Sequence, residues 1–133
     1  MVKQLAIFLE NKAGKASECC KILKEQGVNL LALSIADTTD FGILRMLTED
    51  NAKALAALKK AGYVASEVEL VAIEVPDEAG ALSDLLIALG DSGVNVEYMY
   101  SYAGVDGHAK IAFKTNTPDK AVDALAKAGA KIL

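Results

Sequence analysis

Two stretches of the sequence carry the same pattern and decide the fold. Residues 5–30 read LAIFLENKAGKASECCKILKEQGVNL, and residues 71–96 read VAIEVPDEAGALSDLLIALGDSGVNV. Both begin with a short apolar run, reach an Ala-Gly pair after the same interval and contain Gly-Val-Asn near their ends. An offset of 66 positions superimposes them. Matched glycines together with matched apolar periodicity indicate an internal duplication.

The duplication extends over the rest of the chain. With one additional residue in the second copy, the offset becomes 67 and aligns Leu44 with Ile111 and residues 61–62 with residues 128–129. The chain of 133 residues is therefore predicted to consist of two units, residues 1–67 and residues 68–133. Each unit is close to the size at which a single hydrophobic core is only marginally stable.

Each unit is predicted to run strand, helix, strand, strand, helix, strand. In the first copy we expect strands at residues 4–9, 28–36 and 41–48, a turn at 37–40, and a long strand at 63–75 that also opens the second copy. The second copy is expected to have strands at 94–103, 108–115 and 130–133, with a turn at 104–107.

The helices are predicted from apolar residues at helical spacing, which then define the inward faces. The first helix of each unit should bury Ala16, Cys19, Cys20 and Leu23 in one copy and Leu82, Leu85, Leu86 and Leu89 in the other. The second helix should bury Ala52, Leu55 and Leu58, or Ala121, Val122, Leu125 and Ala128, with Asp50 or Asn51 capping one helix and Thr117 the other.

This element order predicts the fold class. Two tandem βαββαβ units with right-handed crossovers give an α+β, ferredoxin-like fold in which an antiparallel sheet carries both helices on one face. The strand at 28–36 is apolar on both of its alternating faces, however, and a sheet covered on one side should be polar on the other. We therefore expect a sheet face or edge to pack on another unit or another chain, most simply in a homodimer.

The strand at 94–103 carries a row of tyrosines on one face, Tyr98, Tyr100 and Tyr102, which are expected in the core or in an interface.

Composition excludes several classes of function. The chain has 18 acidic and 14 basic residues, and no cluster of Lys and Arg that would bind a phosphate backbone, so no nucleic-acid partner is expected. The apolar run after Met1 is too short for a signal peptide or a membrane span, so a cytoplasmic protein without a membrane partner is expected. Cys19 and Cys20 are neighbours and are expected to remain reduced.

The Ala-Gly turns suggest a ligand site. Glycine allows a backbone to approach a ligand closely, and the free N–H groups of a helix N-terminus attract a carboxylate. Side-chain oxygens near each turn, from Asn11 and Asn29 in one copy and Asp77 and Asn95 in the other, are suited to an ammonium group. Alternatively, Asn11 and Asp77 cap their helices, Gly14 and Gly80 only form turns, and Asn29 and Asn95 stabilise the sheet edge.

The same residues resemble a known family. ACT domains, which are small amino-acid-sensing modules, have a loop and strand motif that this chain resembles twice. The resemblance lies in residues 10–14 with 26–30 in the first copy and in residues 76–82 with 93–96 in the second. The resemblance covers essentially the whole chain, although Ala13 and Ala79 stand where the family usually has proline and Ala16 where it has leucine. It implies a free amino acid as effector, held between two ACT units by residues Asn11, Ala13, Gly14, Asn29, Asp77, Ala79, Gly80 and Asn95.

An enzyme is not expected. His108, the single histidine, has no conspicuous Ser or Cys partner, and the single arginine, Arg45, lies within a strand rather than in the first loop. Neither a metal site nor a phosphate-binding lysine loop is recognisable, so no cofactor is expected. Two hypotheses remain: an amino-acid sensor that controls a separate metabolic enzyme, and a constitutive assembly or regulatory subunit of such an enzyme without a ligand of its own.

Overall fold

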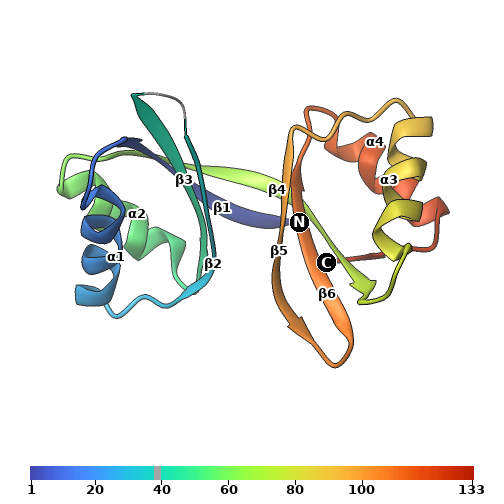
Figure 1. Ribbon diagram of the computed structural model, residues 1–133, viewed down its shortest axis with the longest axis horizontal. Coiled ribbons are helices and arrows are strands. Elements are labelled where there is room, and N and C mark those ends of the chain that lie inside the picture. The colour runs from blue at the N-terminus through green and yellow to red at the C-terminus, as the bar shows by residue number, and fades with distance from the viewer. Residues whose placement is uncertain (38–39) are drawn as a thin grey trace. The chain divides into compact units, whose positions relative to one another are not determined.

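The computed structural model describes residues 1–37 and 40–133 of the chain. The turn predicted at 37–40 includes Thr38 and Thr39, which lie outside the described residues. The structure has two compact units (Figure 1), one formed by Lys3–Val68 and the other by Glu69–Leu133 together with Met1–Val2. The strand β4 (Val64–Pro76) runs without interruption from the first unit into the second, as the long apolar stretch predicts.

The first unit has the predicted βαββαβ order. Its elements before β4 are β1 (Val2–Glu10), α1 (Lys15–Glu25), β2 (Leu30–Asp37), β3 (Phe41–Thr48) and α2 (Asn51–Lys60). The strands lie in the order β2-β3-β1-β4, and β3 is antiparallel to both β1 and β2. Both helices lie on one side of this sheet (Figure 1).

The second unit repeats the arrangement. It contains the remainder of β4, then α3 (Ala81–Asp91), β5 (Tyr98–Val105), β6 (His108–Lys114), α4 (Pro118–Lys127) and β7 (Lys131–Ile132). Its strands lie in the order β7-β4-β6-β5, with β6 antiparallel to β4 and β5. Because the two copies share one strand order, the duplication read from the sequence is a duplication of the fold.

Each unit has a core of its own between its sheet and its helices. In the first core, Leu5, Ile7 and Leu9 of β1 meet Cys19 and Leu23 of α1. The second core repeats this with Val71, Ile73, Val75, Leu85 and Leu89, around the fully buried Phe113. The stripes predicted for α1 and α3 are confirmed, since every member is buried or half-buried.

Details of three elements differ from prediction. In α2 and α4 the inward faces include Ala54 and Ala124, whereas Ala52 and Ala128 are exposed, so those two assignments were wrong. Strand β5 runs from Tyr98 to Val105 instead of over 94–103, so it begins four residues later than predicted, and the turn after it is shorter than the predicted 104–107. Asp50 caps α2 by accepting the N–H of Lys53 at 3.1 Å, but Thr117 makes no side-chain cap bond to α4.

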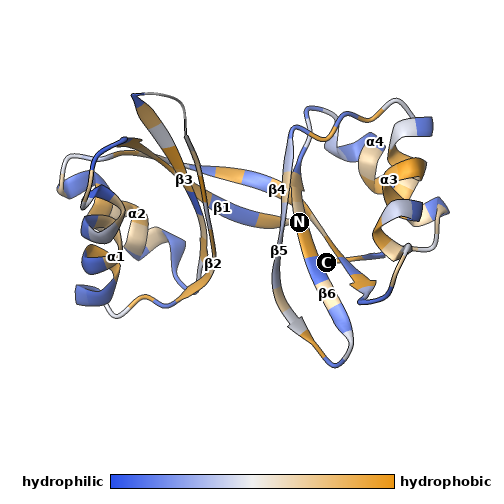
Figure 2. Cartoon of the chain, viewed as in Figure 1, coloured by the Kyte–Doolittle hydropathy of each residue, from blue (hydrophilic) through white to orange (hydrophobic). Residues whose placement is uncertain are grey.

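Strand β2 is an edge strand with exposed apolar side chains. Leu33 and Ile35 pair across the ladder with the core residues Met46 and Leu44, and so face the helix side, yet they are about half exposed, as is Leu31. The hydrophobic part of β2 is orange in Figure 2. In β5 the predicted row of tyrosines is half-buried. It lies on the other face of the strand from Met99 and Ser101, which pair with the core residues Phe113 and Ile111.

Candidate functional site

The loop between β1 and α1 is tied down by backbone hydrogen bonds. The Asn11 N–H donates to the Asp40 carbonyl at 2.9 Å, and the Lys12 N–H donates to the Glu10 carbonyl at 2.8 Å. Gly14 then occupies the N-cap position of α1 with a φ of +87°, a left-handed conformation that favours glycine. Its carbonyl accepts the Glu18 N–H at 3.0 Å and the Ser17 hydroxyl at 2.8 Å.

The loop between β4 and α3 has the same hydrogen bonds. The Asp77 N–H donates to the Gly107 carbonyl at 2.8 Å, and the Glu78 N–H to the Pro76 carbonyl at 2.9 Å. Gly80 is the N-cap of α3 with a φ of +89°, and its carbonyl accepts the Asp84 N–H at 3.1 Å. The backbone hydrogen bonds of the two loops thus correspond one to one.

Neither helix is capped by a side chain. The N-cap residues are Gly14 and Gly80, without a side-chain cap bond, so the alternative that Asn11 and Asp77 cap α1 and α3 is wrong. The first N–H groups of an α-helix have no acceptor inside the helix. The N–H groups of Lys15 and Ala81, the first in each helix, donate to the carbonyls of Lys12 at 3.4 Å and Glu78 at 3.3 Å. Both helices still present the positive end of a helix dipole, with the N–H groups that follow in the first turn, at an exposed loop.

Asn29 and Asn95 lie far from these loops within their own units. Glu10, beside the first loop, pairs with Phe41 at the start of β3, whereas Leu30 pairs with Thr48 at the end of β3. The eight residues of β2 therefore separate the loop from Asn29 by roughly 25 Å. Asn29 is bound to Glu49, through its backbone carbonyl at 3.1 Å and its amide Nδ2 at 3.4 Å. A single unit does not bring the predicted residues together.

The structure instead shows a pocket beside each loop. In the first unit a pocket of about 570 Å³ is lined by the end of β1, one face along the whole length of α1, Phe41, and the link from α2 to β4. In the second unit a pocket of about 380 Å³ has the equivalent position, beside Pro76, Ala81, His108 and the link from α4 to β7. Neither pocket was predicted from the sequence. The alternation in β1 was the available signal, because Phe8 must face away from the core when Ile7 and Leu9 face it.

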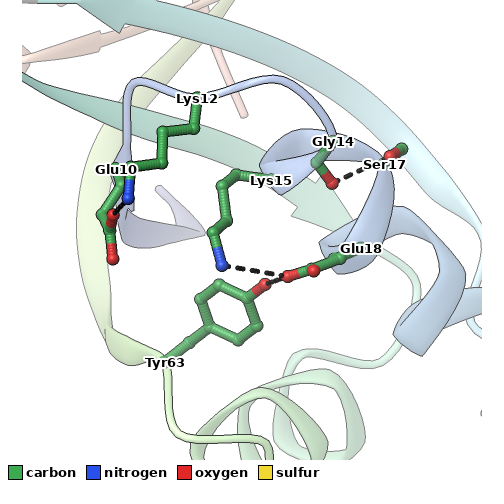
Figure 3. A network of polar contacts seen from close by, with 7 residues as sticks. All are labelled: Glu10, Lys12, Gly14, Lys15, Ser17, Glu18 and Tyr63. Atoms are coloured by element: carbon green, nitrogen blue, oxygen red, sulfur yellow. Dashed lines mark hydrogen bonds and ion pairs between the residues drawn. The ribbon is translucent and has the colours of Figure 1, made fainter.

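Charged side chains surround the first loop and its pocket (Figure 3). The Lys12 ammonium lies 2.7 Å from the Glu10 carboxylate, and the Lys15 ammonium lies 3.5 Å from the Glu18 carboxylate. The Tyr63 hydroxyl donates to the same Glu18 carboxylate. This hydrogen bond raises the pKa of Tyr63 far above its ordinary value and, with Lys15, lowers the pKa of Glu18. The bond from Lys12 likewise lowers the pKa of Glu10.

The described residues give no sign of a metal centre or a membrane span. Nowhere in residues 1–37 and 40–133 do three His, Cys, Asp or Glu side chains gather as a metal ion would require. Within the same ranges, no helix is both long and apolar enough to cross a membrane.

The duplicated fold and its two glycine-capped loops define a tandem pair of small βαββαβ domains, and the comparisons with known proteins identify the family. The chain matches the ACT domain pair family over residues 1–130 and belongs to it. The resemblance read from the loop motifs is thereby confirmed.

Solved structures agree with this assignment. A crystal structure of a protein from Bacteroides thetaiotaomicron is 39% identical, with a TM-score of 0.92, and the match covers 99% of this chain and 91% of that one. Regulatory subunits of aspartate kinase from Thermus thermophilus and Thermus flavus have TM-scores of 0.68 and 0.65 at 15% and 16% identity. These matches cover 95% and 96% of this chain, and 91% and 92% of the subunits, and show a shared fold. No curated protein sequence matches the chain.

Proposed function

We propose that this chain is a regulatory protein that binds a free amino acid. The observation that carries the proposal is the pair of matching loops, in which α1 and α3 begin at left-handed glycines without a side-chain cap. Their first-turn N–H groups can hold an α-carboxylate, with the backbone of Ala13 or Ala79 alongside. Oxygens of Asn11 and Asn29, or of Asp77 and Asn95, can accept hydrogen bonds from the α-ammonium group.

The proposed site needs two units from different copies of the chain. Because β2 separates the first loop from Asn29 within one unit, one effector molecule can contact both only if another copy supplies one of them. The exposed row of Leu31, Leu33 and Ile35 on the edge strand β2 supports a homodimer formed through this edge. An effector bound there would stabilise one arrangement of the two copies over others.

The proposed regulatory target is a separate enzyme of amino-acid metabolism. The names of the two Thermus neighbours, regulatory subunits of aspartate kinase, support a subunit that regulates rather than catalyses. We place this function in the cytoplasm, where the free thiols of Cys19 and Cys20 would persist. The exposed β2 edge also favours a second candidate, a constitutive subunit that contacts an enzyme without any effector.

A binding experiment separates the two candidates. Thermal shift and calorimetry with each of the twenty amino acids should reveal at least one that stabilises the chain. Absence of any stabilisation at millimolar concentration would favour the constitutive subunit.

A matched pair of glycine variants tests the location of the site. Gly80→Ala should weaken binding in the second unit, because the added methyl group strains the loop next to the helix N-terminus. Gly27→Ala is the control, because Gly27 also has a positive φ, +68°, and open space around its position but follows α1 in the first unit and lines neither pocket. Equal affinities in the two variants would contradict the assignment of the site to the loop.

A further inference from the structure

The pockets of the two units are built from equivalent positions. Offsets of 66 and 67 align Phe8 with Glu74, Phe41 with His108 and Val64 with Lys131. All six residues line their respective pockets. A difference between the pockets is therefore a difference in side chains on a repeated backbone.

The first pocket is apolar at these positions, and the second is ionic. Phe8, Phe41 and Val64 are 55%, 57% and 68% exposed, although burial of such side chains is strongly favourable. In the second unit the Lys131 ammonium lies 2.5 Å from the Glu74 carboxylate. An ion pair therefore occupies the positions equivalent to Val64 and Phe8. The pair also lowers the pKa of Glu74. Duplication preserved the pocket while its lining diverged.

The size of the first pocket fits a small molecule. Its volume of about 570 Å³ lies in the range of small-molecule sites, which are roughly 300–1,000 Å³. A stable protein interface buries about 800 Å² on each partner. Three side chains around a concave site are too few for such an interface, whereas they suffice to cover one aromatic or branched aliphatic group.

Polar groups connect this pocket to the loop. Glu10 and Lys15 lie directly before and after residues 11–14, and both line the pocket together with Glu18. A zwitterion held at the loop could therefore direct its side chain toward Phe8 and Phe41. The mixed charges at the margin, Glu10 and Glu18 against Lys15, are compatible with both ends of a zwitterion.

We infer that the two units differ in specificity: the first-unit pocket binds the large apolar side chain of an aromatic or branched aliphatic amino acid, and the second-unit pocket does not. This inference rests on the proposed function for the amino-acid nature of the ligand. The apolar group itself is assigned from the exposed lining of the pocket.

The test transfers the second-unit residues into the first unit. The double variant Phe8→Glu, Val64→Lys reproduces the Glu74 and Lys131 pair on surface positions, and its melting temperature should change little. Phenylalanine and leucine should bind the unmodified chain more tightly than serine and aspartate do, and the double variant should lose at least about tenfold in affinity for the apolar pair. Ile87→Glu is the control, because Ile87 is 57% exposed on α3 and lines neither pocket, and it should bind as the unmodified chain does.

Additional probes separate failure of this inference from failure of the proposed function. Binding of only polar amino acids, or unchanged binding of phenylalanine and leucine by the double variant, would overturn the inference and leave the sensor function intact. If no amino acid binds, 3-phenylpropanoate and 4-methylpentanoate test the pocket without an ammonium group. If these two compounds bind the unmodified chain but not the double variant, the result supports the apolar pocket. If they do not bind the unmodified chain, the inference is overturned.

Discussion

At the scale of single residues, the contact between Tyr63 and Glu18 couples the residue that precedes β4 to the first turn of α1. The Tyr63 hydroxyl donates to the Glu18 carboxylate, which also lies 3.5 Å from the Lys15 ammonium. Both interactions favour the ionised carboxylate, which explains its lowered pKa. The stabilisation is therefore present above the pKa that Glu18 has in the unfolded chain, near 4.5, and is lost as the pH falls through the folded-state value.

Removal of the tyrosine hydroxyl should shift this titration. In Tyr63→Phe we expect the pKa of Glu18 to rise toward its ordinary value, as measured by NMR titration of the side-chain carboxyl group. The difference in unfolding free energy between the variant and the unmodified chain should shrink as the pH is lowered through the acidic range. Tyr102→Phe should leave the Glu18 titration unchanged, because burial alone raises the pKa of Tyr102. Identical Glu18 titration curves in Tyr63→Phe and the unmodified chain would contradict this account.

The loop residues show how far reasoning from single residues can reach. Gly14 and Gly80 were identified because both copies place glycine between an apolar run and a helical stripe. The alternative role of Asn11 and Asp77, as helix caps, does not hold, because each left-handed glycine itself takes the N-cap position three residues later. The roles of Ala13, Ala79, Asn29 and Asn95 in ligand binding stay predictions.

At the scale of secondary-structure elements, the edge strand β2 determines how copies of the chain can associate. Under the proposed function, Leu33→Lys should place a charge in the middle of the apolar row and convert the dimer into a monomer, as measured by light scattering coupled to size-exclusion chromatography. Val105→Lys changes an exposed valine at the end of the equivalent strand β5 and should leave the association intact. A dimer that persists in Leu33→Lys would rule out pairing through β2.

Helices were predicted with unequal accuracy, for a physical reason. The faces of α1 and α3 were clear because large apolar residues alternate with charged or small ones. In α2 and α4 many positions are alanine, which fits either face, so Ala52 and Ala128 were placed inward although both are exposed. The residues that take part in the two cores, together with Leu58 and Leu125, are Ala54 and Ala124 instead.

At the scale of the whole molecule, the two cores share no residue, although β4 contributes to both units. Leu58 and Leu125 occupy equivalent positions and are both completely buried. Replacement of either by Ala should cost about 2–5 kcal/mol, through lost burial and a residual cavity.

Hydrogen exchange should locate this loss. In Leu58→Ala, the exchange of amides in residues 3–68 should accelerate more than in residues 69–133, and Leu125→Ala should show the reverse pattern. Equal acceleration throughout the chain in both variants would show that the units unfold together, because β4 couples them too strongly for independent opening.

The sequence by itself determined the duplication, the order of strands and helices, and the apolar character of β2, because periodicity and turn residues are local properties that a chain of this length displays directly. It also determined the family, through the loop motifs. Only the tertiary structure decided that Asn29 lies a full strand length from the first loop, and that Phe8, Phe41, Tyr63 and Val64 meet around one pocket. These residues are far apart in sequence, and the pairing of β1 with β3 and β4 brings them together. No local pattern encodes that proximity.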